Sequence, residues 1–279
     1  MDLLQKTRHV LRLYKFSPRK RLGQNFLIDN DLLQKLPFYA SVNDADVVLE
    51  VGAGLGFLTR LLAQKCRKVV AVEIDSRLVR ILKEQFHDVQ NVELIEGDVL
   101  EVSIPPFNKV VSTPPYSISS LLLFWLLERK FDCAVLAFQK EFAERLNASV
   151  DSKDYSRLTV STYYRADVEL LDYVPKELFY PPPDVDSIVV RLKPRKPPFS
   201  MANKELFFGL VQMLFTQRNR KVRKAVIPFL QTQGFTGKEA LGIADSLLFH
   251  DKRVRELAPE DFGAIANEIA RKRREKNSL

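Results

Sequence analysis

The sequence predicts an α/β protein, in which a doubly wound parallel sheet is followed by a smaller, all-helical domain. Between residues 46 and 192, short β-branched apolar runs alternate with segments whose apolar residues recur at helical spacing. This alternation is typical of parallel strands covered by helices on both faces. Beyond residue 199 the strand pattern stops and only helical periodicity remains. With 279 residues, 46% of them hydrophobic, the chain is long enough to build both cores.

The strands and helices of the first domain follow in order. Buried strands are expected at 47–51, 68–73, 92–96, 109–112 and 134–138, and helices at 58–64, 76–86 and 119–128. Two more strands, at 167–174 and 186–192, have no clear helix between them and are separated by the stiff run Phe179–Pro183. We therefore expect these two strands to pair antiparallel at one edge of the sheet.

The helical domain is expected after a linker. Residues 193–199 combine prolines with basic residues, a composition that cannot continue a strand. Helices are then expected at 204–215, 221–231, 238–247 and 259–274. We therefore predict a first domain over 1–192, with a basic extension at 1–17, the linker 193–199, and a helical domain over 200–279.

The net charge of +8 is concentrated at the two ends of the chain. Residues 1–26 and residues 200–279 each carry +6, whereas residues 27–199 carry −4. Basic ends of this kind favour a polyanionic partner such as nucleic acid. Solvated helix faces with a basic tail would give the same count, so charge alone leaves both interpretations open.

Several classes of protein are excluded by composition. Two cysteines, Cys66 and Cys133, cannot form a disulfide framework or a cysteine zinc site, which indicates a reducing compartment. Three scattered histidines form no metal constellation, and the longest apolar run, at 121–127, is too short to span a membrane. We therefore expect a cytoplasmic protein with no bound metal and no membrane partner.

A glycine-rich loop follows the strand at 47–51, in the run Glu50–Gly56. Glycines there let the chain turn sharply and let a ligand approach the backbone at the carboxyl end of a strand. Dinucleotide-binding loops use Gly-x-Gly-x-x-Gly, whereas this loop has Gly-x-Gly-x-Gly after an acid. The loop, with Gly52, Gly54 and Gly56, resembles the donor-binding loop of S-adenosylmethionine-dependent methyltransferases, which have a Rossmann-like domain.

Two later acids support a methyl-donor site. Glu73 ends the second strand, where its carboxylate can accept hydrogen bonds from both hydroxyls of a ribose. Asp98 follows the third strand, and the resemblance places it at the adenine amine of the donor, with Val99 in the same site. A single acid at the end of a strand is common. All three features in order on successive strands predict S-adenosylmethionine as the cofactor.

The fourth strand leads into Thr113-Pro114-Pro115-Tyr116, which resembles the Asn/Asp/Ser-Pro-Pro-Tyr signature of methyltransferases that act on the exocyclic amines of bases. An adenine amine is a poor nucleophile because its lone pair is delocalised into the ring. Hydrogen bonds from the amine to Thr113 and to the Pro114 carbonyl would favour a tetrahedral nitrogen aligned with the methyl group. Tyr116 would stack on the base. A rigid strand-to-helix turn is the alternative interpretation.

Further motifs extend the resemblance along nearly the whole chain. They are Arg19–Leu27, Lys140–Glu141 with Arg145, Asp154–Leu158, Phe179–Ser187 and Phe215–Lys224. Together with the glycine loop, these motifs are similar to those of the small-subunit ribosomal RNA adenine N6,N6-dimethyltransferase family. That family dimethylates two adjacent adenosines near the end of the small ribosomal RNA during ribosome assembly. The resemblance implies that Gln24, Asn25 and Leu27 line the donor site, beside Thr113, and that Phe179 stacks on a flipped-out adenine opposite Tyr116.

Basic residues near both ends are the expected RNA contacts. They are Arg19, Lys20 and Arg21 in the first domain and Arg218, Arg220, Lys221, Arg223 and Lys224 in the second. RNA loops are held by such phosphate contacts together with the stacking of splayed bases. We expect the partner to be small-subunit rRNA in an immature ribosomal subunit, and the protein to be a monomer.

One departure from the family pattern keeps a second hypothesis open. The family normally begins its fourth motif with Asn, whereas this chain has Thr113, whose hydroxyl is shorter. Methylation would then be weakened or would stop more often at one methyl group. The alternatives are a ribosome-assembly or nucleic-acid-binding factor with weakened or lost catalysis, as in the mitochondrial transcription-factor branch, and the related large-subunit rRNA methyltransferases of antibiotic resistance. A small-molecule methyltransferase is disfavoured because it has no use for basic ends.

Overall fold

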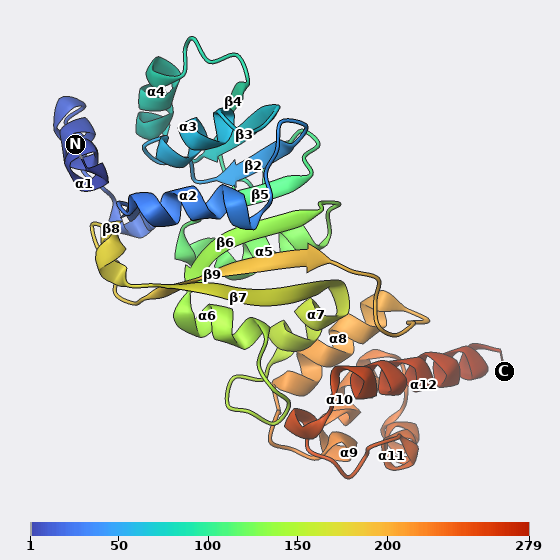
Figure 1. Ribbon diagram of the computed structural model, residues 1–279. Coiled ribbons are helices and arrows are strands. Elements are labelled where there is room, and N and C mark those ends of the chain that lie inside the picture. The colour runs from blue at the N-terminus through green and yellow to red at the C-terminus, as the bar shows by residue number, and fades with distance from the viewer. Residues whose placement is uncertain (1, 279) are drawn as a thin grey trace. The chain divides into compact units, whose positions relative to one another are not determined.

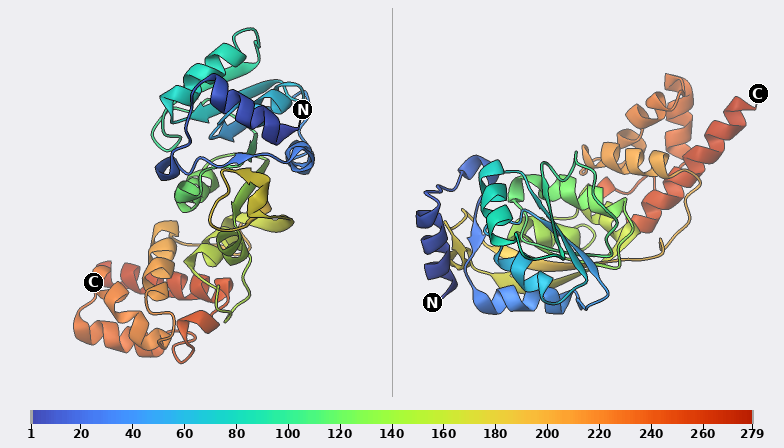
Figure 2. Two further views of the ribbon diagram at one scale, coloured as in Figure 1. Left: turned by 90° about the vertical axis from the view of Figure 1, so that its left-hand side faces the viewer. Right: turned by 90° about the horizontal axis from the view of Figure 1, so that it is seen from above.

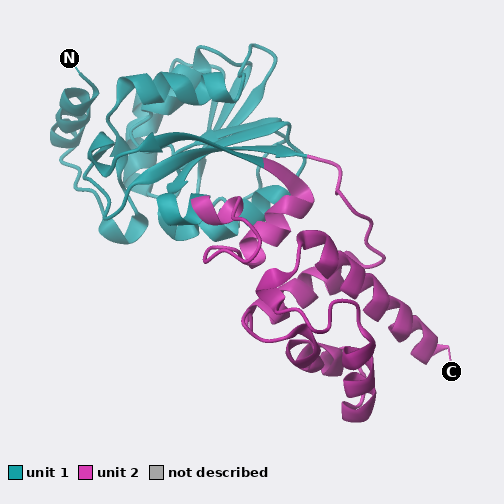
Figure 3. Cartoon of the chain, turned by 60° about the horizontal axis from the view of Figure 1, so that its bottom comes forward, with its two compact units in different colours: residues 1–143, 168–194 teal, residues 144–167, 195–279 magenta. Residues whose placement is uncertain are grey.

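The computed structural model describes residues 2–278, which divide into two compact units (Figure 3). Unit 1 is assigned residues 1–143 and 168–194, and unit 2 is assigned residues 144–167 and 195–279. The junction at 194/195 lies inside the expected linker. The division differs from the predicted domains in one respect: residues 144–167 belong with the helical unit, because their apolar side chains are buried in its core.

A seven-stranded sheet forms the centre of unit 1, in the order β4-β3-β2-β5-β6-β9-β7 (Figure 1). Its first five strands are parallel to their neighbours, and β9 runs antiparallel to β6. In chain order the strands are β2 (Val47–Val51), β3 (Lys68–Glu73), β4 (Val92–Glu96), β5 (Lys109–Ser112), β6 (Cys133–Gln139), β7 (Ala166–Val174) and β9 (Ser187–Pro194). The fold class is confirmed, and the two late strands occupy one edge as expected.

The parallel strands form because their residues are apolar on both faces. Val48, Leu49, Val69 and Val70 are fully buried, as a strand covered on both sides requires. The helices of unit 1 that accompany the sheet are α2 (Asn30–Tyr39), α3 (Phe57–Ala63), α4 (Ser76–Gln85) and α5 (Ser119–Leu127). Of these, α3, α4 and α5 were expected within one residue at each end.

The amino-terminal part of unit 1 contains elements that the sequence pattern did not indicate. Helix α1 (Leu3–Leu13) buries Leu11 in a cluster with Leu78 and Ile81 of α4, which places the two helices side by side (Figures 1 and 2). A short 3₁₀ turn follows at Lys20–Leu22. Strand β1 (Phe26–Leu27) then pairs antiparallel with β8 (Phe179–Tyr180), so that Leu27 lies opposite Phe179.

Unit 2 is helical. It contains the last turn of α6 (Lys140–Leu146), then α7 (Arg157–Arg165), α8 (Lys204–Phe215), α9 (Val222–Ala225), α10 (Ile227–Thr232), α11 (Gly237–Ser246) and α12 (Pro259–Asn277). The predicted helix at 221–231 is divided into α9 and α10. Pro228 causes the break, because it has no N–H to donate to the carbonyl of residue 224. Within residues 2–278, no helix has the length and apolar character needed to cross a membrane.

Candidate functional site

A cavity of about 170 Å³ opens in unit 1 at the carboxyl ends of β2, β3, β4 and β5. Parallel sheets bind ligands at this edge, because the loops that leave adjacent strands converge there. The cavity is lined by most of the residues that the sequence predicted for the donor site: Gln24, Asn25, Leu27, Gly52, Gly54, Glu73, Asp98, Val99 and Thr113. They come from five separate segments of the chain, which the fold brings together.

The glycine loop has the backbone conformation that requires glycine. Gly52 and Gly54 have φ angles of +78° and +58°, and a Cβ on Gly54 would lie 3.2 Å from the ring of Phe26. Gly56 also has a positive φ, but it lies outside the described lining of the cavity. A Cβ there would lie 2.8 Å from Phe86, so Gly56 lets the first turn of α3 approach α4.

Glu73 is buried at the end of β3, with 6% of its surface exposed. Its Oε2 accepts a hydrogen bond of 2.9 Å from the N–H of Gly54, and its Oε1 accepts one of 2.9 Å from the N–H of Asp75. Burial raises the pKa of Glu73, while these hydrogen bonds lower it. Each oxygen keeps a second lone pair, so both can still accept from ribose hydroxyls. These two acceptor oxygens fit the nucleoside part of S-adenosylmethionine.

Asp98 and Val99 form the wall after β4. Oδ1 of Asp98 accepts a hydrogen bond of 2.9 Å from the N–H of Leu100, which fixes the carboxylate at the cavity. Val99 is 3% exposed and supplies apolar surface beside it. A carboxylate next to an apolar wall suits a purine, whose ring is apolar and whose amine donates hydrogen bonds.

Glu50 also lines the cavity, although the sequence pattern gave it no role beyond preceding the glycine loop. It is 2% exposed, and its Oε2 accepts a hydrogen bond of 2.6 Å from the hydroxyl of Thr59. Burial raises the pKa of Glu50 to about 8, and the nearby carboxylate of Glu73 acts in the same direction. The signal that could have identified it is an acid inside an otherwise apolar buried strand.

The fourth motif lies beside the glycine loop, since a Cβ on Gly52 would lie 3.2 Å from the ring of Pro115. Thr113 and Pro115 line the cavity, whereas Pro114 is buried. The hydroxyl of Ser112 is within 2.5 Å of the carbonyl oxygen of Val51, which ties β5 to β2 directly below the motif. The motif is therefore anchored on a rigid strand.

Tyr116 is held by a hydrogen bond of 2.5 Å between its hydroxyl and that of Ser187, at the start of β9. Burial raises the pKa of Tyr116, so the phenol stays neutral. Phe179 lies differently from the expectation. Its ring is 3% exposed and belongs to the apolar core of unit 1, because β8 pairs with β1, and it is outside the described cavity lining.

The basic residues of unit 1 and unit 2 have different environments. Arg19, Lys20 and Arg21 are all exposed, and Arg21 also reaches the cavity lining. In unit 2, Arg220, Lys221 and Lys224 are exposed and Arg223 is half-buried. Arg218 instead donates hydrogen bonds of 2.7 Å to the carbonyls of residues 152 and 153. Its guanidinium therefore fixes a loop of unit 2.

A second basic segment, residues 250–255, was not expected from the sequence and lies beside residues 221–223 of unit 2. The N–H of Val222 donates to the carbonyl of Lys252, and the N–H of Arg223 donates to that of His250. An isolated bridge also pairs Lys221 with Arg253.

Within the part of the chain that the structure describes, no group of His, Cys, Asp and Glu could hold a metal ion.

Comparisons with known proteins agree with this geometry. The family model described as ribosomal RNA adenine dimethylase matches residues 15–271. A relative from Methanosarcina barkeri, named a probable ribosomal RNA small subunit methyltransferase A, is 44% identical over 249 residues, covering 88% of this chain and 86% of its own. A protein of the same name from Pyrococcus abyssi is 41% identical over 257 residues, covering 92% and 93%.

Solved structures show the same similarity. A dimethyladenosine transferase from Plasmodium falciparum superposes with a TM-score of 0.78 at 30% identity, covering 90% of this chain and 98% of its own. The 23S rRNA methyltransferase ErmE superposes with a TM-score of 0.65 at 29% identity, covering 88% and 100%. The cavity with its glycine loop, its two strand-end acids and its fourth motif thus lies in a chain that belongs to the ribosomal RNA adenine dimethylase family.

Proposed function

We propose that this chain is an S-adenosylmethionine-dependent rRNA adenine N6,N6-dimethyltransferase. Its proposed substrates are the exocyclic amines of two adjacent adenosines near the 3′ end of small-subunit rRNA. The strongest support is the single cavity that joins the glycine loop, the acids after β3 and β4, and Thr113 after β5. Membership of the family and the names of the relatives supply the reaction class and the RNA.

Several residues would hold the donor. Glu73 would accept the ribose hydroxyls and Asp98 the adenine amine, while Gln24, Asn25 and Leu27 would cover the cavity from the amino-terminal side. S-adenosylmethionine supplies, when bound, a methyl group on a positively charged sulfur. The buried carboxyl groups of Glu50 and Glu73 suit that charge, because a nearby cation favours the ionised form of a carboxyl group.

The residues after β5 would hold the target amine. The hydroxyl of Thr113 and the carbonyl of Pro114 can each accept a hydrogen bond from it, which favours a tetrahedral nitrogen and fixes its direction. Tyr116, anchored by Ser187, would stack on the base. Phe179 is buried opposite Leu27, so in the unliganded protein we assign it the support of β1, which lines the cavity. The adenosine must leave its stack to enter such a site.

The accessible basic residues would hold the RNA backbone. In unit 1 they are Arg19, Lys20 and Arg21, and in unit 2 they are Arg220, Lys221, Arg223 and Lys224. Phosphate contacts by these residues predict that RNA binding weakens steeply with salt. We propose that the substrate is an immature small ribosomal subunit, bound by a monomer in the cytoplasm.

Methyl transfer to ribosomal particles tests the proposal. The protein is incubated with labelled S-adenosylmethionine and either immature small subunits or large subunits, and the modified nucleotides are mapped by mass spectrometry. We expect two adjacent dimethyladenosines in the small-subunit RNA. Transfer to the large-subunit RNA alone would instead support an activity like that named for ErmE. Donor and RNA binding without transfer would support a non-catalytic assembly factor.

Substitutions at Thr113 separate these outcomes further. Thr113→Val removes the hydroxyl at nearly constant volume and should abolish most transfer, whereas the matched control Thr113→Ser keeps the hydroxyl. Thr113→Asn supplies a longer acceptor and should raise the share of dimethylated over monomethylated product. Equal product ratios in the wild type and Thr113→Asn would contradict a limiting role for the short side chain.

A further inference from the structure

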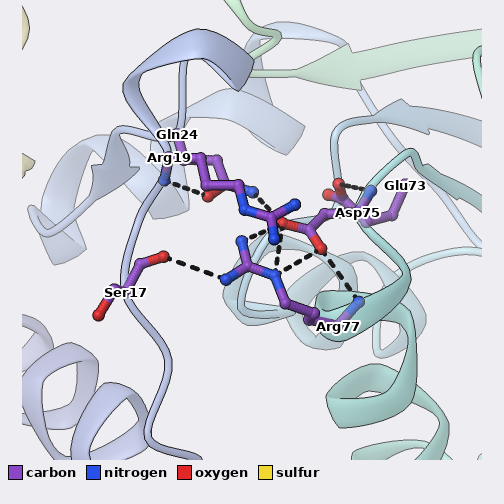
Figure 4. Close-up of polar contacts among 6 residues, drawn as sticks. All are labelled: Ser17, Arg19, Gln24, Glu73, Asp75 and Arg77. Atoms are coloured by element: carbon purple, nitrogen blue, oxygen red, sulfur yellow. Dashed lines mark hydrogen bonds and ion pairs between the residues drawn. The ribbon is translucent and has the colours of Figure 1, made fainter.

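Asp75 lies two residues beyond Glu73, at the start of α4, and joins the two sides of the donor cavity (Figure 4). It is 3% exposed, yet it lies outside the described cavity lining. Its own N–H donates 2.9 Å to Oε1 of Glu73, whose other oxygen accepts from Gly54 in the glycine loop. One side of Asp75 is therefore bonded to the wall formed by β2 and β3.

The other side of Asp75 holds the amino-terminal segment, residues 17–25. Its Oδ2 accepts a hydrogen bond of 2.9 Å from Nε2 of Gln24, and Oε1 of Gln24 accepts one of 2.7 Å from the N–H of Arg19. Gln24 is 9% exposed. The Gln24 amide thus donates to Asp75 and accepts from Arg19. The second of these hydrogen bonds closes residues 19–24 into a loop over the cavity.

Arg77 strengthens the same junction. Its Nε donates 2.9 Å to Oδ1 of Asp75, and its Nη2 donates to Oδ2. Its Nη1 reaches the carbonyl of Ser17 at 3.4 Å (Figure 4). Its guanidinium also lies 4.3 Å from the centre of the ring of Phe16. The start of α4 therefore contacts Ser17 and Gln24 of the amino-terminal segment and, just before it, Phe16.

Capping of α4 does not account for these contacts. A helix N-cap needs one side-chain oxygen, and Oδ1 of Asp75 serves that purpose by accepting from the N–H of Arg77 at 3.0 Å. Oδ2 is directed instead at Gln24 and the guanidinium. The arrangement of donors and acceptors runs without a break from Gly54 through Glu73, Asp75 and Gln24 to Arg19.

We propose that Asp75 is a positioning residue for the methyl donor. It acts as a latch that holds residues 17–25 over the cavity, and it links the ordering of this segment to the position of the Glu73 carboxylate. This inference rests on the proposed function for the identity of the donor. Asp75 touches neither the cavity nor the reacting groups, and it acts through Gln24 and Glu73. When the latch opens, the fraction of protein able to bind the donor falls, and the apparent Kd rises in proportion.

The substitution Asp75→Asn separates the latch from the cap. Asn keeps a side-chain oxygen for the N–H of Arg77 and caps helices as well as Asp. Its amide nitrogen then faces Nε2 of Gln24, donor against donor. If the Gln24 amide flips by about 180°, its Nε2 faces the N–H of Arg19 instead, and two donors again oppose each other. The double variant Asp75→Asn/Gln24→Glu removes the conflict at Gln24, because the introduced carboxylate could accept from both partners. The donor–donor contact with Nη2 of Arg77 is common to the single and double variants and cancels in their comparison.

The test combines calorimetric titration of the full chain with S-adenosylmethionine and amide hydrogen exchange of the unliganded protein. For Asp75→Asn we expect a Kd raised about tenfold and faster exchange across residues 17–25, with most of the faster exchange reversed in the double variant. The matched control is Asp29→Asn, the same change at the N-cap of α2, where Oδ1 accepts from Leu32. It should leave both quantities unchanged.

Three results would overturn the latch: unchanged exchange across residues 17–25 in Asp75→Asn, an unchanged Kd in that variant, or exchange in the double variant that stays as fast as in Asp75→Asn. Thermal unfolding of each variant shows whether a loss of binding is a loss of folding. Failure of the wild-type protein to bind S-adenosylmethionine would contradict the proposed function, and the exchange measurements on unliganded protein would then decide the latch on their own.

Discussion

The buried carboxyl group of Glu50 makes the stability of the protein depend on pH in a defined direction. Its pKa is raised from 4.5 to about 8 in the folded protein, with burial as the largest cause. Between these values the folded protein keeps the proton and the unfolded chain releases it. Stability therefore falls as pH rises through this window and levels off above pH 8.

The substitution Glu50→Gln removes this dependence. Gln resembles the protonated acid, and its Oε1 can accept the hydrogen bond from Thr59. At about 1.4 kcal/mol for each tenfold change in proton affinity, the shift corresponds to an upper value of about 5 kcal/mol. We expect wild type and variant to be similarly stable near pH 5, and the variant to be more stable above pH 8.

Denaturant unfolding of both proteins from pH 5 to pH 9 measures the effect. The raised pKa of Glu73 contributes to both proteins and largely cancels in the difference. Glu101→Gln, at an exposed position, controls for the removal of a charge alone. If plots of the free energy of unfolding against pH for wild type and Glu50→Gln stay parallel from pH 5 to pH 9, the reasoning is refuted.

Three further predictions concern packing and hydrogen bonds. Gly56→Ala, at a φ of +80° and 2.8 Å from the neighbouring ring, should cost about 2–4 kcal/mol of unfolding free energy without weakening donor binding in a titration. Arg218→Ala should destabilise the protein through its lost carbonyl contacts, whereas Lys224→Ala should lower the salt slope of RNA binding by about one and leave the melting temperature unchanged. Tyr155→Phe leaves the carbonyl of Leu257 without its buried 2.7 Å hydrogen bond and should cost about 1–3 kcal/mol in denaturant unfolding.

The sheet could be predicted from the sequence because its strands are buried on both faces. Runs such as Val47–Val51 and Lys68–Glu73 have an apolar pattern that few other elements share, and their observed bounds are the expected ones. The pairing of β1 with β8 has no such signal. Each strand is two residues long, and the partners Leu27 and Phe179 are far apart in the sequence. Only the tertiary fold brings them together.

The convergence of the predicted site residues at one cavity could largely be predicted, because strand ends meet at one edge of a parallel sheet. Glu73 and Asp98 follow adjacent strands, so their meeting at one edge required no knowledge of side-chain packing. The burial of Phe179 and the structural hydrogen bonds of Arg218 were not predictable in this way. Both depend on which neighbours a side chain finds in three dimensions, and neither a motif nor a charge count contains that information.

Unit 2 consists of two separate stretches of the chain, 144–167 and 195–279. This arrangement restricts how genetic recombination can exchange units between this protein and divergent relatives. Tyr155, Val160 and Tyr164 are buried in the same cluster as Phe207 and Phe262, although strands of the other unit separate them in the chain. A single crossover in the linker would transplant α8–α12 without these three side chains and leave a hole in the grafted core. Transfer of the helical unit alone requires three crossovers, before residue 144, after residue 167 and before residue 195, so recombination tends to keep the helical unit and the sheet that carries the donor cavity as a matched pair.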